Sequence, residues 1–226
     1  MKRLIAAIDN AKNLQHIDDE AEEEQEEEAV VIMEREAPDE SKPNDIPGYE
    51  IATVPAAIGE EEIHQHSTGR LSIWIEEIVK VESPVHFDEV ARRMIEAAGV
   101  TRIGSRIREA LQQAIKYAEA NKWIRVSEEF LWHREMKTPR LRDRSDLPAS
   151  VKKLKYIAPE EMLLAIEKVV RESVAIQPEA AVPFVARIFG FNRVTEEMKA
   201  EIIGMIGRAL DQSIVYQEGE FLKVFN

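Results

Sequence analysis

The chain contains the same pattern of residues twice. Residues 71–132 align without a gap with residues 162–223, so that each residue of the first copy meets the residue 91 positions further on. Gly99 meets Gly190 in this alignment, and apolar residues stay apolar over most of its length. A repeat of this length corresponds to a whole small domain and not to one unit of a solenoid. The chain is therefore expected to fold as two copies of one small structure.

The first copy predicts three helices followed by a β hairpin. From Leu71, apolar residues recur at the spacing of one helical face until Ser83 and Pro84 break the pattern. The second helix is expected to end at Gly99, which can adopt the left-handed conformation of a helix cap. The expected elements are helices from about 71 to 82, 87 to 98 and 104 to 121, and strands at 123–126 and 130–133.

The second copy predicts the same elements with two prolines added. Pro178 stands where a proline is tolerated in the first turn of a helix. Pro183 is expected to kink or shorten that same helix, because it removes a backbone donor from the helix interior. The expected elements are helices near 162–172, 178–189 and 195–212, and strands at 215–217 and 221–224.

Three helices followed by a hairpin, within about 62 residues, is the layout of a winged helix-turn-helix domain. The predicted fold class is mainly α with small β hairpins (α+β), formed by tandem winged helix-turn-helix domains behind a largely disordered acidic segment. The expected parts are 1–68, a short helix and an acidic, proline-containing flexible segment; 69–135, winged-helix domain 1; 136–156, a basic linker; and 157–226, winged-helix domain 2.

The negative charge is concentrated at the N-terminal end. The formal net charge is −13, yet residues 1–68 alone hold 5 Lys and Arg against 19 Asp and Glu. The stretch 18–28 is almost wholly acidic, while residues 2–14 have the apolar spacing of one short helix. Because like charges repel and little apolar surface is present, residues 15–68 are predicted to be mostly disordered or loosely attached.

The stretch between the two copies is the most basic part of the chain. Eight Lys and Arg side chains lie between Arg134 and Lys155, against three acidic ones. Such a segment can follow a phosphate backbone without reading its sequence. The alternative is a solvated hinge that meets the acidic stretch 18–28 of the same molecule and so masks the basic surface.

The third helix of the first copy carries side chains suited to nucleic acid. In a winged helix-turn-helix this helix can enter the major groove, while the wing and helix ends contact phosphates. Arginine can bind guanine or phosphate with two hydrogen bonds, and glutamine can pair with adenine. The alternative is that these are ordinary solvated positions, with Glu109 and Glu119 diluting the positive charge. The candidate contacts are Arg102, Arg106, Arg108, Gln112, Gln113 and Lys116, together with Arg140, Arg142 and Arg144 of the linker.

The second copy lacks this basic helix face. Glu197 stands opposite Arg106, and Gly204 and Gly207 also replace larger polar residues. Glycine destabilises a helix by on the order of 1 kcal/mol relative to alanine, so the two glycines suggest the close approach of another element. The second copy is therefore interpreted as a packing or protein-contact unit.

Three stretches of the first copy also resemble a known family. They are residues 81–93 (VESPVHFDEVARR), 99–110 (GVTRIGSRIREA) and 130–132 (FLW). Over about residues 70–135 the chain resembles the family catalogued as domain of unknown function 3320. That domain sits at the C-terminal end of large bacterial proteins related to superfamily 1 DNA/RNA helicases, often after a restriction-endonuclease-like domain. The resemblance implies that the chain is the C-terminal part, or a short relative, of a helicase/nuclease protein, with residues 2–14 as a trailing helix of the nuclease domain.

No catalytic, metal-binding or cofactor-binding set can be assembled from the sequence. His86 stands just before the second helix, where a polar residue can cap the helix, and its acidic neighbours suit a helix start. His64 and His66 lack a third metal ligand, and the chain has no cysteine. The three tryptophans are expected as core and wing anchors, although Trp132 could also stack on a base. The chain is therefore predicted not to be an enzyme.

Two functions are compatible with these features. The first is a non-catalytic DNA-binding accessory module of a helicase/nuclease-type protein, in which the third helix and wing of the first copy and the basic linker contact DNA. The second is a protein-interaction or homodimerisation module, favoured by the acidic total and the glycines of the last helix. No stretch is long and apolar enough to span a membrane, and the absence of cysteine favours a cytoplasmic location. The expected partners are DNA, duplex or single-stranded, and the helicase/nuclease domains of a parent protein, with no membrane.

Overall fold

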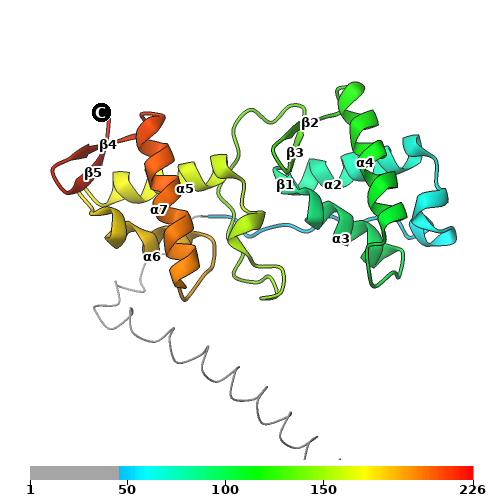
Figure 1. The fold of residues 1–226 in the computed structure, drawn as a ribbon, viewed down its shortest axis with the longest axis horizontal. Helices are drawn as coiled ribbons and strands as arrows, with labels where there is room; N and C mark the ends of the chain where they lie inside the picture. Colours follow the sequence, from blue (N-terminus) through cyan, green and yellow to red (C-terminus); the bar gives the residue numbers. More distant parts are fainter. Residues whose placement is uncertain (1–45, 226) are drawn as a thin grey trace, which may run out of the picture.

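The computed structural model describes residues 46–225. Two groups of helices lie side by side along the longest axis of the molecule, with an irregular stretch of chain between them (Figure 1). We call residues 63–133 repeat one and residues 154–224 repeat two. Repeat one consists of η3 (Ile63–Gln65), α2 (Thr68–Glu82), β1 (Val85–His86), α3 (Phe87–Ala97), α4 (Ser105–Ala120), β2 (Ile124–Ser127) and β3 (Phe130–His133).

Repeat two has a counterpart for nearly every element. Its elements are η4 (Leu154–Tyr156), α5 (Pro159–Glu172), α6 (Pro178–Ile188), α7 (Glu196–Asp211), β4 (Val215–Glu218) and β5 (Phe221–Val224).

The two repeats match at the level of strand register. β1 pairs with β3 at Val85 and Leu131, and an isolated bridge joins Ile176 to Leu222 at the equivalent positions. The β2–β3 and β4–β5 hairpins also pair in equivalent antiparallel registers. The helices and strands expected from the sequence are present in both repeats, and the described chain is an α+β structure.

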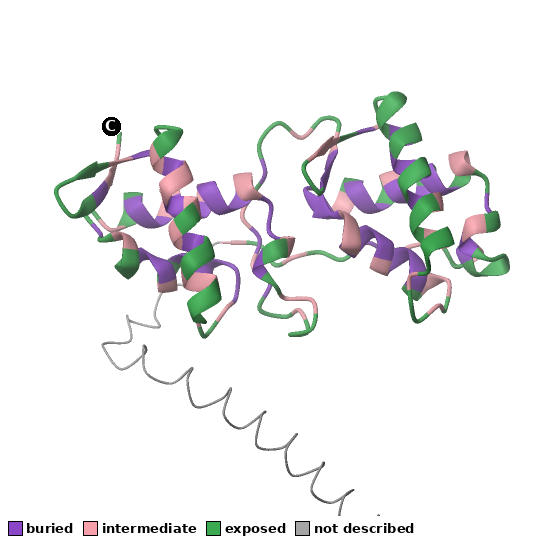
Figure 2. Cartoon of the chain, in the orientation of Figure 1, coloured by how far each residue is buried: buried purple, intermediate pink, exposed green. Residues whose placement is uncertain are grey.

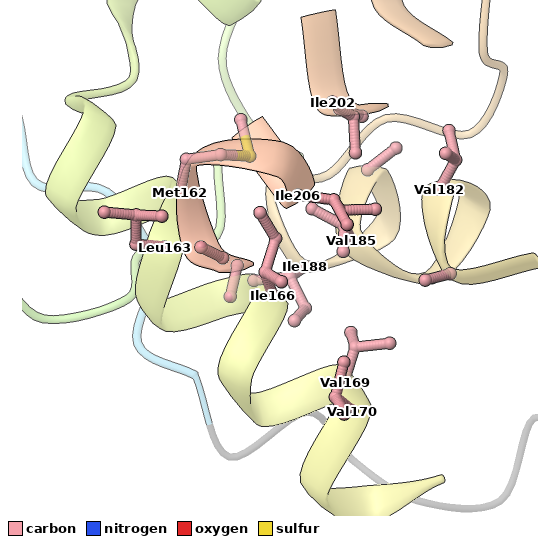
Figure 3. Packing of buried hydrophobic residues seen from close by; sticks show 14 of the residues in the cluster. Met162, Leu163, Ile166, Val169, Val170, Val182, Val185, Ile188, Ile202 and Ile206 are labelled. Carbon is pink, nitrogen blue, oxygen red and sulfur yellow. The ribbon is translucent and has the colours of Figure 1, made fainter. Parts of the chain in front are cut away.

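Each repeat has its own hydrophobic core. Ile75 and Ile166 occupy equivalent positions, and both are fully buried. Buried positions line the inward sides of the helices in both repeats (Figure 2). Trp74 and Trp132 are also buried, as expected of anchors. In repeat two the core side chains come from all three helices (Figure 3), for example Ile166 of α5, Val185 of α6 and Ile206 of α7.

The helix ends follow local signals in the sequence. His86 caps α3, because its Nδ1 accepts a hydrogen bond from the backbone N–H of Asp88 at 3.0 Å. The capping role expected of this histidine is thereby confirmed. Gly99 and Gly190 have φ angles of +68° and +80°, in the left-handed region that a glycine enters without strain.

The expectations that Pro183 shortens its helix and that another element closely approaches Gly204 and Gly207 are wrong for the part of the chain that the structure describes. Pro183 lies inside α6, yet α6 has the same 11 residues as α3 and is not shortened. The buried side chains of Val182 and Val185 on either side of the proline keep this segment packed against the core. Gly204 and Gly207 show no close approach of another element within residues 46–225, since a Cβ at either position would meet none of these residues within 4 Å.

The expectation that residues 15–68 are flexible is wrong for the part that the structure describes. A 3-10 helix, η2 (Ala56–Glu60), packs against α3, and Ile58 and Ile63 are almost completely buried. A few apolar residues suffice here because they add to a core that repeat one has already formed. The predicted helix at 2–14 and the acidic stretch 18–28 lie outside the described residues.

Candidate nucleic-acid interface

α4 packs against the rest of repeat one through one apolar face. Leu111, Ala114 and Ala118 of this helix are buried, and the helix packs against α2. The Ser72 hydroxyl of α2 lies 2.6 Å from the carbonyl oxygen of Thr68 and 2.8 Å from that of Ala114, and it can donate to either. The contact with Ala114 shows how closely α4 packs on α2. The opposite face of α4 is thereby turned to solvent.

Most of the predicted contact residues lie on that solvent face. Arg106, Gln112, Gln113 and Lys116 are exposed along α4, and Arg102 is exposed in the turn before it. None of these five side chains forms an ion pair or a side-chain hydrogen bond with another residue in the range 46–225. Their charges and amide groups are therefore available to a ligand.

Arg108 is held more closely by its own repeat. Its guanidinium lies 5.1 Å from the centre of the Phe87 ring and 3.8 Å from a carboxylate oxygen of Asp88. The side chain remains about half exposed. A surface ion pair contributes only about 0–1 kcal/mol, so a phosphate could replace Asp88 as the partner.

A hollow of about 420 Å³ lies at the start of α4. Gly104, Ser105 and Arg106 line one side, and the backbone N–H groups at a helix start favour anions. Glu62 lines the hollow as well, and its carboxylate lies 3.4 Å from Nε2 of His64. This carboxylate weakens the positive potential, so the hollow adds little to the basic surface.

The tip of the repeat-one hairpin is acidic. Glu128 lies 3.7 Å from Arg208 of α7, and Glu129 lies 3.3 Å from Nε2 of His86. Arg125 of β2 stacks on the Trp132 ring at 4.1 Å. Two carboxylates at the tip repel a phosphate backbone, so the hairpin has the wrong charge for the contact expected of a wing.

Arg142 and Arg144 of the linker are buried, which corrects the prediction that they contact nucleic acid. Their exposed fractions are 4% and 3%. Arg142 donates hydrogen bonds to the two carboxylate oxygens of Glu161 at 3.3 and 2.7 Å, and Arg144 donates to the same oxygens at 2.9 Å each. The two guanidinium groups already have a buried counterion, so neither can reach a phosphate outside.

Arg142 also joins the two repeats. Its guanidinium donates to the carbonyl oxygens of Glu82, Ser83 and Pro84 at 2.6, 3.2 and 2.9 Å. These carbonyls lie at and just after the C-terminal end of α2, where a positive charge is favourable. Because Glu161 belongs to α5, one side chain connects both repeats. The stretch considered as a solvated hinge is therefore a buried joint at this point.

A second buried carboxylate lies beside the first. Glu82 accepts hydrogen bonds from Arg93 at 2.8 and 3.0 Å and from the Tyr49 hydroxyl at 2.8 Å. The Tyr49 ring lies 4.8 Å from the guanidinium of Arg142 and 4.9 Å from that of Arg144. We call this group the inter-repeat cluster: Tyr49, Glu82, Arg93, Arg142, Arg144 and Glu161.

The charges of the inter-repeat cluster stabilise each other. Burial by itself raises the pKa of Glu161, but the charges and hydrogen bonds of Arg144 and Arg142 outweigh it and bring the pKa below its usual value. Burial by itself lowers the pKa of Arg142, whereas Glu161 raises it above its usual value. Burial, together with the charge of Glu82, raises the pKa of Tyr49. The tyrosine therefore keeps its proton and acts as a donor.

The sequence contains a signal for the two buried carboxylates. Glu82 lies four residues after Ile78, and Glu161 lies four residues before Ala165, so each falls on the apolar stripe of its helix. A carboxylate in such a stripe is rarely buried without a partner. The position of Tyr49, far from both helices in the sequence, has no comparable signal.

Several linker cations remain at the surface. Lys137, Arg140 and Lys153 are exposed, and none of the three forms an ion pair or a side-chain hydrogen bond within residues 46–225. Of the three linker arginines predicted as contacts, Arg140 is therefore the one whose side chain a ligand can reach.

The equivalent helix of repeat two presents different chemistry. Glu196, Glu197 and Glu201 are exposed on α7, and Gly204 is exposed where α4 has Gln113. This surface is acidic and lacks long side chains at its centre. The basic helix face is thus a property of repeat one.

The described residues contain no group of three or more His, Cys, Asp and Glu side chains that could hold a metal ion. His66 is buried, and its Nε2 lies 3.0 Å from the carbonyl oxygen of Ile58, a structural contact. None of the helices described between residues 46 and 225 is long and apolar enough to cross a lipid bilayer.

The fold and this surface define a two-repeat α+β protein with one basic helix face. Residues 61–109 match the family described as "Protein of unknown function (DUF3320)". The match spans α2, α3 and the start of α4, and it confirms the resemblance drawn from the sequence motifs over this part of the chain. The searches of curated proteins and of solved structures gave no match to the chain.

Proposed function

We propose that the protein is a non-catalytic DNA-binding module. Its contact is the α4 surface, made up of Arg102, Arg106, Arg108, Gln112, Gln113 and Lys116. In this proposal each repeat is a winged helix-turn-helix unit, and α4 is the recognition helix of repeat one. Repeat two is the structural partner that the buried Arg142 and Glu161 hold in place.

The observation that supports this proposal is a difference between duplicated helices. α4 and α7 occupy equivalent places, yet Arg106 and Lys116 of α4 have Glu197 and Gly207 as their counterparts on α7. A requirement of folding would act on both copies, because both helices pack on equivalent cores. The basic residues of α4 are therefore explained better by a ligand than by the fold.

The residue types on α4 favour DNA among anionic ligands. Arginine and lysine neutralise phosphates and release counterions, which makes binding strongly dependent on salt. Gln112 and Gln113 lie among the cations and can pair with base edges. Arg140 in the linker adds one further phosphate contact in this proposal.

The family resemblance supports a role beside a helicase or nuclease. In the family, this type of domain lies at the C-terminal end of helicase-related proteins. We therefore propose that the module helps such an enzyme to engage DNA and contributes no catalytic group of its own.

The test is a titration of the full-length protein with fluorescently labelled duplex and single-stranded DNA, followed by fluorescence anisotropy at several salt concentrations. The test variant is Arg102→Glu/Arg106→Glu. The matched control is Arg193→Glu/Lys199→Glu, which makes the same change in charge at the start of α7, with Arg193 equivalent to Arg102. The α4 variant should bind more weakly and its salt slope should fall by about 2, while the control keeps the wild-type slope.

Equal loss in both variants would mean that total charge, and not the α4 surface, determines binding. Absence of binding at low salt would overturn the proposal and leave the protein-interaction function. A chain that starts at residue 46 tests the masking hypothesis separately. If the acidic stretch 18–28 covers the basic surface, removing it should raise DNA affinity, and an unchanged affinity would contradict masking.

A further inference from the structure

The hairpin of repeat one is covered on its outer face by the start of repeat two. Leu131 belongs to the core, so Phe130 and Trp132, its neighbours in β3, point to the opposite side. These two aromatic side chains are only 6% and 1% exposed. They are buried in a separate small cluster with Ala158, the residue before α5, and with Met136.

The equivalent face of repeat two has no such cover within residues 46–225. Leu222 is part of the core, as Leu131 is, whereas Phe221 and Phe225 are 43% and 54% exposed. Tyr216 of β4 packs beside Phe225, with 4.9 Å between the ring centres. We call Tyr216, Phe221 and Phe225 the open hairpin face. Exposed aromatic side chains that gather on one face are typical of a binding surface.

The segment that covers repeat one combines three kinds of side chain. Lys155 places its Nζ 3.4 Å from a carboxylate oxygen of Asp88. The Tyr156 ring lies 5.1 Å from the ring of His86. Along the segment, this contact comes after that of Lys155 and before that of Ala158. Ala158 supplies the small apolar group against the hairpin. The cover is therefore a basic and aromatic segment that leads into a helix.

Repeat two retains several of the groups that receive this segment, although Lys223 stands where repeat one has Trp132. An aromatic ring is present on β5, a carboxylate near the start of α6, and a polar pair between the residue before α6 and the hairpin. In that pair the Gln177 side-chain nitrogen donates to a carboxylate oxygen of Glu220 at 3.0 Å. The equivalent positions are Phe130 and Phe221, Asp88 and Glu179, His86 and Gln177, and Glu129 and Glu220.

We propose that the open hairpin face binds a segment of a partner protein with the chemistry of residues 153–158. The segment is basic and aromatic, and it ends in a small apolar residue just before a helix. Its lysine pairs with Glu179, its aromatic ring packs beside Gln177, and its small apolar residue covers Phe221. This interaction surface is independent of the proposed DNA contact, which lies on repeat one.

A second copy of the chain fits this face less well. Its own residues 153–158 are already packed on its repeat one. The equivalent segment before α2 has Gln65 and Ser67 where the covering segment has Tyr156 and Ala158. That segment offers neither the aromatic ring nor the small apolar group.

The test uses a labelled synthetic peptide of residues 150–163 as the probe. Within the protein, the tethered segment has an effective concentration of about millimolar or more and keeps its place on repeat one. The added peptide therefore reports on the open hairpin face. Anisotropy should show saturable binding to the full-length protein, weakened about tenfold or more by Phe221→Ser. Phe184→Ser is the matched control, because Phe184 is similarly exposed but lies on α6.

Three results would overturn the proposal. They are no saturable binding of the peptide, equal weakening by Phe221→Ser and Phe184→Ser, and equal binding of a peptide in which Lys155→Glu and Tyr156→Ser have been introduced. Sedimentation that showed a dimer abolished by Phe221→Ser would assign the face to a second copy and overturn it as well. Phe225→Ser, near the end of the chain, is the second variant, and circular dichroism of each variant verifies that the fold is retained.

Discussion

Repeat one and repeat two share a core and differ in their surfaces. Ile75 and Ile166 fill equivalent positions in two well-packed interiors. On the surface, α4 exposes Arg106 where α7 exposes Glu197, and the outer hairpin face is covered in one repeat and open in the other. Core positions are constrained by close packing, whereas surface substitutions usually change stability little. A duplicated fold can therefore keep its architecture while each copy takes up a separate contact.

The largest difference in stability is expected between Glu161 and its equivalent in repeat one, Arg70. Glu161→Gln should lower the free energy of unfolding by about 3–5 kcal/mol, because Arg142 and Arg144 would stay buried without a counterion. Arg70→Gln should lower it by less than about 1 kcal/mol, because its side chain is exposed. Urea unfolding measures both. Similar losses at the two positions would show that the inter-repeat cluster contributes no more than a surface ion pair.

The shared core predicts equal effects at equivalent positions. Ile75→Ala and Ile166→Ala should each lower the free energy of unfolding by about 2–5 kcal/mol, since both side chains are fully buried. Unfolding followed by circular dichroism provides the measurement. A loss confined to one variant would break the comparison, because it would mean that the two cores are not packed alike.

Substitution of the equivalent glycines Gly99 and Gly190 should lower the stability of the protein by different amounts. Gly99→Ala should cost about 1–2 kcal/mol of stability, from the positive φ alone, because a Cβ there meets no atom of residues 46–225 within 4 Å. Gly190→Ala should cost more, because its Cβ would clash with the backbone nitrogen of Ser145. Comparison of the two melting temperatures tests this order. The reverse order would show that the linker does not pack on repeat two in solution.

The sequence was sufficient for features that depend on nearby residues. Helical spacing, the cap at His86 and the left-handed turn at Gly99 are determined within a few positions along the chain. Because of the duplication, each element could be predicted from two separate stretches of the sequence. These local signals therefore predicted the helices and hairpins to within a few residues.

The roles of the linker arginines depend on distant residues and were not predictable in the same way. In the sequence, Arg140 and Arg142 are two similar cations in one basic stretch. The fold leaves the first exposed and places the second between α2 and Glu161. Residues 46–67 show the same limitation, because their few apolar side chains bury only where a preformed core receives them. Burial of this kind is a property of the tertiary structure and is not encoded by composition.

The smallest expected effect concerns the glycines of α7. Gly204→Ala and Gly207→Ala should each raise the free energy of unfolding by about 0.5–1 kcal/mol, because alanine restricts the unfolded chain and a Cβ at either position meets no atom of the described residues within 4 Å. The equivalent changes in α4, Gln113→Ala and Lys116→Ala, should stay within about 0.5 kcal/mol. For a chain of this size, a gain of 1 kcal/mol raises the melting temperature by about 2–4 °C, which scanning calorimetry resolves. A loss of stability at either glycine would mean that another element or another molecule packs closely on α7 in solution, and the difference between the two third helices would then be one of partners as well as of charge.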